Sequence, residues 1–183
     1  MTTREVFEKL WALPISTESV GLIPAAADDA AYFCTPENAE PLARLGCDGI
    51  HFVLLPGDER VYCVDPAMGE IGTYVLPVAE SGEEFLSYLL FCGDANPLTQ
   101  LYWLTEPRFR ALIEEEKTAS WPGCEAYFEK KRAALAAIAE TFGVSPCDPF
   151  APVRAIQAAF DPSALRFSDE YYDVLGLERD AGR

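Results

Sequence analysis

Apolar residues near the start of the chain recur at the spacing of a helix. In "TREVFEKLWAL" (3–13), Val6, Leu10 and Leu13 fall on one face, and Pro14 follows as a helix-breaking residue. Further along, "AAYFC" (30–34) is typical of a short strand. The next segment, "TPENAEPLARLG" (35–46), predicts a short helix capped by Thr35 and stopped by Gly46.

The pattern then changes to one rich in β-branched and aromatic residues. "GIHFVLL" and "RVYCV" are separated by "PGDE", whose glycine and aspartate are typical turn residues. We therefore expect residues 49–55 and 60–65 to pair as an antiparallel hairpin, with 73–78 as a further strand of the same sheet. Strands that follow one another directly favour a meander over β-α-β units.

From residue 81 onward the pattern is helical. "SGEEFL" has Ser81 at the N-cap position and Glu84 three residues later, the spacing of a capping box, and Gly93 ends this helix. Further helices are predicted in "NPLTQLYWL", "TEPRFRALIEEEK", "CEAYFEKKRAALAAIAETFG", "DPFAPVRAIQAAF" and "SDEYYDVL". The fold class expected is α+β: a small antiparallel sheet packed with helices, followed by a helical C-terminal half.

The 183 residues suffice for one well-buried domain and are short for two. We divide the chain into an α+β domain over 1–116 and a helical extension over 117–183 that packs on the same core. No apolar run approaches the roughly 20 residues that span a bilayer, and charged residues interrupt the N-terminal stretch where a signal peptide would be apolar. A cytoplasmic protein is therefore expected.

Charge is the most informative bulk property. The net charge is −16, and the only basic cluster is "KKR" at 130–132. Residues 1–92 hold 4 basic and 15 acidic side chains, a balance of −11, against 10 and 15, or −5, in the remainder. Phosphate backbones and anionic membranes are bound by clustered Lys and Arg, so neither is an expected partner. A basic protein is the expected partner, and solubility alone is the competing explanation.

One stretch contains residue types that are common in active sites. The only histidine, His51, lies near Cys47, Asp48 and Cys63. Four residues of extended chain between Cys47 and His51 span roughly 13 Å, which is too far for a nucleophile and its base unless the chain bends sharply. The expected role of His51 is a half-buried strand residue hydrogen-bonded to the backbone; an enzyme that uses Cys47 and His51 is the less favoured alternative.

The remaining cysteines do not suggest a metal site or a disulfide framework. The six thiols are scattered and never form C-x-x-C, so neither the paired ligands of structural zinc nor a cysteine scaffold is present. Several lie inside apolar segments, where a free cysteine behaves as a small hydrophobe. We expect reduced thiols, no metal and no cofactor.

Together, "LGCDGIHFVLLPGDERVYCVDPAMGE", "YVLPVAESGEEFLSYLLFCGDAN" and "LYWLTEPRFRALIEE" resemble the SUKH superfamily, the Smi/Knr-type group of cell-wall-regulator homologues and bacterial toxin-immunity proteins. The shared pattern is a glycine-rich entry to a strand, a hairpin with "VY.VD", a third strand and an acidic-capped helix. It covers roughly residues 42–116, whereas 117–183 lie outside it. The resemblance implies an α+β binding protein without catalytic residues.

These observations predict a non-enzymatic protein-binding domain. Its role is that of an immunity protein that neutralises a basic toxin domain or, as the alternative, that of a regulatory or structural adaptor. Candidate partner-binding residues are the acids near the hairpin turn and the helix start, where variation leaves the core undisturbed: Asp58, Glu59, Glu80 and Glu83. Glu84 is left out because the capping box already accounts for it.

Overall fold

The architecture was obtained from a computed structural model that describes residues 1–26, 28 and 31–178. A five-stranded antiparallel sheet with the strand order β1-β2-β3-β4-β5 forms its centre. The strands are β1 (Ile23–Pro24), β2 (Glu40–Arg44), β3 (His51–Leu54), β4 (Val61–Val64) and β5 (Val75–Ala79). Because spatial order equals chain order, the sheet is a meander, as predicted.

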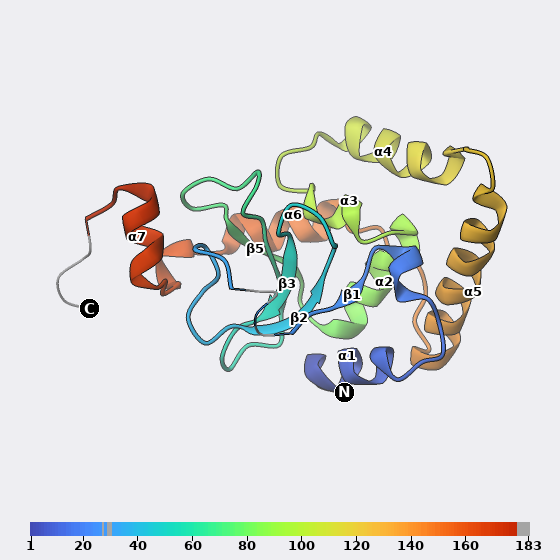
Figure 1. The fold of residues 1–183 in the computed structure, drawn as a ribbon, viewed down its shortest axis with the longest axis horizontal. Coiled ribbons are helices and arrows are strands. Elements are labelled where there is room, and N and C mark those ends of the chain that lie inside the picture. The colour runs from blue at the N-terminus through green and yellow to red at the C-terminus, as the bar shows by residue number, and fades with distance from the viewer. Residues whose placement is uncertain (27, 29–30, 179–183) are drawn as a thin grey trace.

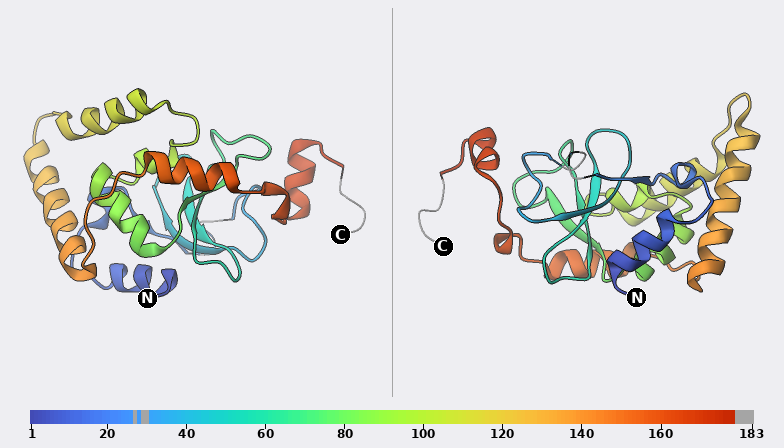
Figure 2. Two further views of the ribbon diagram at one scale, coloured as in Figure 1. Left: turned by 180° about the vertical axis from the view of Figure 1, so that it is seen from behind. Right: turned by 60° about the horizontal axis from the view of Figure 1, so that its bottom comes forward.

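Helices surround the sheet and make up most of the C-terminal half (Figure 1), which confirms the α+β class. The α-helices are α1 (Thr3–Trp11), α2 (Gly82–Cys92), α3 (Asn96–Thr99), α4 (Glu106–Thr118), α5 (Cys124–Phe142), α6 (Phe150–Ala159) and α7 (Asp169–Leu175). Two short 3₁₀ helices, η1 (Thr17–Val20) and η3 (Pro162–Ala164), complete the secondary structure described. Helix α5 lies at one end of the molecule and α7 at the other, and the views in Figure 2 show the same order.

The predicted hairpin is present. β3 pairs with β4 in the register His51↔Val64 to Leu54↔Val61, and β4 pairs with β5. Alternation along β3 places Phe52 and Leu54 in the larger apolar core with α1 and α2, whereas Val53 joins a second cluster on the opposite face. Both faces of the central strands are therefore covered.

The prediction for residues 30–46 was wrong in both parts. Residues 31–34 form a turn rather than a strand, and Ala30 lies outside the described residues. The predicted helix over 35–46 is instead a turn followed by β2. Asn38 has φ +60°, which interrupts any helix, and β2 gains backbone hydrogen bonds by pairing with β3. Pro41, which has no N–H to donate, sits beside an irregularity in that pairing.

The C-terminal helices contribute to the same core as the sheet. Ala134 and Ile138 of α5 and Val153 of α6 belong to the larger apolar cluster. The Lys131 ammonium on α5 lies 2.9 Å from the Asp94 carboxylate after α2, and both side chains are only 9% exposed. Gln157 of α6 donates to the Pro77 carbonyl on the edge strand β5.

Candidate interaction surface

Thr3, the first residue of α1, joins three segments that are far apart in the sequence. Its buried hydroxyl donates to the Glu59 carbonyl (2.5 Å) and accepts from the Gly82 amide (2.9 Å). Its backbone amide donates to the Glu59 carboxylate at 2.6 Å. A Cβ atom at Gly82 would come within 2.9 Å of the Val6 side chain, so only glycine allows this approach of α1 to α2. The hairpin turn and the starts of α1 and α2 consequently meet at one place.

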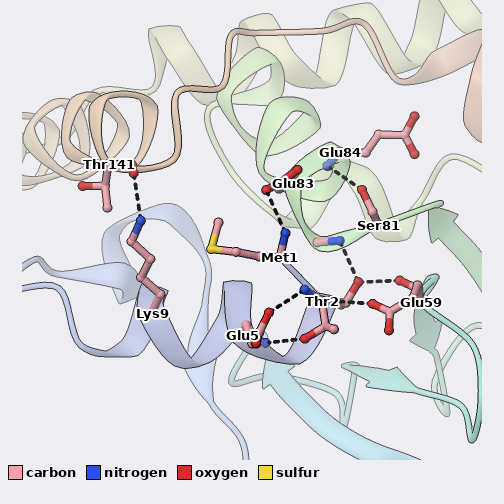
Figure 3. Close-up of polar contacts among 11 residues, drawn as sticks. Met1, Thr2, Glu5, Lys9, Glu59, Ser81, Glu83, Glu84 and Thr141 are labelled. Atoms are coloured by element: carbon pink, nitrogen blue, oxygen red, sulfur yellow. Dashed lines mark hydrogen bonds and ion pairs between the residues drawn. The ribbon is translucent and has the colours of Figure 1, made fainter.

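Acidic side chains gather around this junction (Figure 3). Glu5 accepts from the Thr2 amide, which completes a capping box at the start of α1 and lowers the pKa of the Glu5 carboxyl group. Glu59 lies at the same helix end, where backbone N–H groups and the helix dipole favour negative charge. The Glu83 carboxylate is 3.7 Å from the Met1 amino group. The fold thus brings together two predicted partner-binding residues, Glu59 and Glu83. Glu5, which was not predicted, lies beside them.

The start of α2 places Glu80 and Glu84 differently from each other. Glu80 is exposed, whereas Glu84 is half-buried and accepts from the Glu80 backbone amide at 2.6 Å. Ser81 accepts from the Glu84 amide, as the capping box predicts. In a regular capping box the Glu84 carboxylate would accept from the amide of Ser81, the N-cap residue. Here it accepts from the amide of Glu80, one residue earlier. Glu84 therefore has a structural role, and Glu80 presents its carboxylate to solvent.

Asp58 is occupied by neighbours on its own hairpin. Its carboxylate accepts from Arg60 through Nε and Nη2 and from the Tyr62 hydroxyl at 2.7 Å. Partial burial acts to raise its pKa, but these hydrogen bonds outweigh it and lower the pKa of Asp58 to about 2. Asp58 also lines a cavity of about 310 Å³ together with Tyr62 and Phe160. The Asp58 carboxylate therefore holds the hairpin together, and it is less available than an unbonded carboxylate to contact a partner.

The acidic surface is hereafter defined as Glu5, Glu59, Glu80 and Glu83. Sequence reasoning missed Thr3 and Arg60, which position two of the predicted acids. Thr3 is separated from Glu59 by 56 residues and from Gly82 by 79, so no local pattern could reveal it. Arg60 had a usable signal, because an aspartate two residues before an arginine at the end of a tight turn can pair with it.

His51 is fully buried within the sheet. A carbonyl can only accept, so Nδ1–H donates to the Gly49 carbonyl (2.7 Å) and Nε2 accepts from the Thr35 hydroxyl (3.1 Å). The Tyr32 ring stacks on the imidazole at 5.5 Å. Burial lowers the pKa of His51 in spite of the Gly49 bond. The predicted bond to the backbone is present, and both ring nitrogens are engaged within the fold.

Cys47 lies in the exposed turn before β3. Desolvation and the adjacent Asp48 raise the pKa of its thiol, whereas a nucleophilic cysteine needs a lowered pKa. All six cysteines are free thiols, and those at 34, 63, 92 and 124 are buried. Within residues 1–26, 28 and 31–178, no group of three or more His, Cys, Asp or Glu side chains could hold a metal ion. The geometry gives no support to an active site at Cys47 and His51.

Comparisons with known proteins returned no match among protein-family models, curated proteins or solved structures. The resemblance to the SUKH superfamily therefore stays a prediction that rests on the motifs quoted from the sequence. In the part of the chain that the structure describes, no helix is long and apolar enough to cross a bilayer.

Proposed function

We propose that this chain is a non-catalytic protein-binding domain that recognises a basic partner through the acidic surface. The observation that carries the proposal is the convergence of Glu5, Glu59 and Glu83 from three segments on one junction (Figure 3), with Glu80 directly before the Ser81 cap of α2. Glu5, Glu59 and Glu80 are exposed, and Glu83 is half-buried. In a chain of net charge −16, this surface would attract a positively charged partner.

The biological role proposed is that of an immunity protein. Nuclease toxins carry basic surfaces because they grip phosphate backbones. An acidic surface steers onto such a site and covers it, and long-range attraction mainly raises the association rate. The motifs that resemble the SUKH superfamily support the same role, since that group includes toxin-immunity proteins.

The first experiment co-expresses the chain with toxin domains encoded by neighbouring genes and measures survival of the host cell. Glu80→Lys with Glu83→Lys is the informative double variant, because neither carboxylate anchors the junction at Thr3. The matched control is Glu114→Lys with Glu115→Lys, two exposed residues on α4 that give the same change of charge. We expect protection by the native chain and the control, and loss of protection with the Glu80/Glu83 variant.

A second measurement follows association with the recovered partner by stopped flow. Electrostatic steering is screened over about 8 Å at physiological ionic strength, so the association rate should fall as salt rises. The Glu80/Glu83 reversal should reduce it further, whereas the α4 control should have a smaller effect. An association rate insensitive to both salt and the reversal would remove the acidic surface from consideration.

An adaptor of the cell-wall-regulator type is the alternative role. An adaptor would use the same acidic surface to bind its partner but would not neutralise a toxin domain. Recovery of a stable partner from the native host, identified by mass spectrometry, together with no protection against any toxin domain, would favour the adaptor over the immunity role.

A further inference from the structure

A second surface with a different chemistry lies near α7, away from α1 in all views (Figures 1 and 2). Here the β4–β5 loop (65–74) and the C-terminal segment (160–178) enclose a recess of about 190 Å³. Its wall is mostly apolar and aromatic and includes Ile71, Tyr74, Pro162, Leu165, Phe167 and Tyr171. Because an apolar cavity of about 150 Å³ accepts benzene, this recess has room for one phenyl ring or branched aliphatic side chain.

The aromatic wall of the recess is held by ring contacts. Phe167 and Tyr171 stack with centroids 4.0 Å apart and planes 12° from parallel. Tyr74 meets Tyr171 edge-on at 6.2 Å, and Phe33 meets Tyr74 in the same way at 5.3 Å. Such offset and edge contacts stabilise one arrangement of the rings. The recess is therefore part of the packed structure rather than a gap between loosely placed side chains.

The loop beside the recess is equally fixed. The buried Asp65 carboxylate accepts from the Ala67 and Met68 amides at 3.1 and 2.9 Å. The Tyr102 hydroxyl donates to the Met68 carbonyl at 2.8 Å. A Cβ atom at Gly69 would lie 2.5 Å from the Asp65 carbonyl oxygen, so the loop needs glycine to close this tightly.

This anchored loop nevertheless presents apolar side chains to solvent. Ile71, at the edge of the recess, is 61% exposed, and Met68 on the same loop is 59% exposed. On α7, Val174 is 57% exposed. An exposed apolar side chain such as Ile71 at a preformed recess on a fixed loop is typical of a binding surface, because little conformational entropy remains to be lost on binding.

Acidic residues flank these apolar groups. Glu70 immediately precedes Ile71 and Glu170 immediately precedes Tyr171, and both glutamates are exposed. An apolar centre with a charged rim is the usual anatomy of a protein interface, and the sign of this rim selects a basic partner.

We infer that the recess between the β4–β5 loop and α7 is a second docking surface, which takes one large apolar side chain from a partner segment flanked by Lys or Arg. This inference goes beyond the acidic surface near α1 and depends on a different set of residues. The phenyl or aliphatic side chain fills the recess and contacts Ile71, while Glu70 and Glu170 face the basic flanks.

The test titrates the isotopically labelled full chain with a short lysine-rich peptide that carries one central phenylalanine, followed by NMR. One matched peptide has alanine in place of the phenylalanine, and another has glutamate in place of the lysines. We expect chemical-shift changes confined to residues 70–75 and 162–175, and at least tenfold weaker binding by either matched peptide.

Two variants of the chain locate the binding site. Ile71→Glu should weaken binding of the phenylalanine peptide at least fivefold, although it adds a negative charge. Trp121→Glu is the matched control, because Trp121 is 46% exposed and lies between α4 and α5, outside the recess. Ser163→Trp, designed to fill the recess with an indole, should abolish the shifts near Tyr171. Circular dichroism checks that all variants are folded.

Several results would overturn the inference. One is equal binding of the phenylalanine and alanine peptides, and another is equal binding of the acidic peptide. Shifts at Glu59 and Glu80–Glu83 instead would place the peptide on the acidic surface, which contradicts the recess while supporting the proposed function. Self-association of the chain that Ile71→Glu abolishes, seen by analytical ultracentrifugation, would make a second copy the occupant instead. Conversely, binding at the recess that survives the Glu80/Glu83 reversal would support the recess whatever becomes of the acidic surface.

Discussion

The two faces of the sheet are covered in different ways. On one face, Phe52 packs edge-on against Phe85 of α2, and the apolar cluster continues through α1 into α5 and α6. On the other face, Val53, Tyr62 and Val64 form a smaller cluster. Their cover is a succession of short pieces: the turn around Phe33, Phe160, the segment from Leu165 to Phe167 and the seven-residue α7. One face is covered by long helices. The other is covered by loops and aromatic rings, mainly of residues 160–177, which are called the strap below.

The difference shows what the C-terminal residues contribute to the fold. Most of the residues that cover the second face of the sheet lie between Phe160 and Leu177, outside the part of the chain that resembles the SUKH superfamily. Both faces of β3 and β4 are apolar, so the sheet needs this cover to keep Tyr62 and Val64 from water. The strap also leaves the recess at Ile71. We therefore expect the first face to contribute more to stability than the second, and the recess beside the strap is where we propose binding.

The largest expected effect comes from cutting the chain between the two proposed parts. A chain of residues 1–116 loses Ala134, Ile138 and Val153 from the main core and the part of the second-face cover that lies between Phe160 and Leu177. We expect it to lose cooperative unfolding and near-ultraviolet circular dichroism. A chain of residues 1–160 should keep the first face and bind a hydrophobic dye through the second. Cooperative, dye-free folding of residues 1–116 would show that the extension is independent of the core.

The next largest effect should separate the two faces by point substitutions. Phe85 is fully buried against Phe7 and Phe52, so Phe85→Ala should lower the free energy of unfolding by about 3 to 5 kcal/mol. Phe167→Ala, in the half-buried strap, should lower it by only about 1 to 2 kcal/mol, because its surroundings can relax toward solvent. Urea unfolding followed by circular dichroism measures both. Equal losses would mean that the strap is as integral as the helices.

The sequence predicted the sheet better than it predicted the cover. The strand predicted over 49–55 is present, and its period of two places Ile50 and Phe52 in one apolar cluster and Val53 in the other. The segment 35–46 carried local helix signals, yet pairing with β3 decided its structure. Local propensity is weak compared with the backbone hydrogen bonds that β2 gains by pairing with its neighbouring strands.

The candidate sites were predicted only in part for a related reason. A count of charged residues could find Glu59 and Glu83. It could not show that Thr3 brings their segments together, because Thr3 bonds Glu59, 56 residues away, and Gly82, 79 residues away. The recess was not anticipated at all. Its wall is built from the loop around Ile71 and the distant residues Phe167 and Tyr171, and neither segment has a pattern that signals a cavity.

A third effect concerns the attachment of α5 to the first face. Lys131→Met leaves the Asp94 carboxylate buried without its cation, which should lower the free energy of unfolding by about 3 kcal/mol. The matched control is Lys130→Met, because Lys130 is the exposed neighbour on the same helix and should change stability by less than about 0.5 kcal/mol. Thermal unfolding at neutral pH compares the two. Similar melting temperatures for both variants would mean that the pair contributes nothing to holding α5.

The smallest effect distinguishes Asp58, which belongs to the second face, from Glu80, which belongs to the acidic surface. The Asp58 and Glu59 carboxylates both accept hydrogen bonds within the fold. Because the pKa of Asp58 falls from 3.8 to about 2 on folding, the unfolded chain binds this proton more tightly. The ionised Asp58 carboxylate therefore stabilises the fold in full above about pH 4, and this stabilisation is lost as the pH falls toward 2.

Asp58→Asn should lower the free energy of unfolding by about 1 kcal/mol at pH 7, after screening by solvent, and the difference from the native chain should shrink below pH 4. Glu80→Gln should change stability by less than about 0.5 kcal/mol at either pH. Urea unfolding at pH 7 and at pH 3 measures all four values, and a pH-independent difference for Asp58→Asn would show that the Arg60 and Tyr62 contacts do not hold its charge.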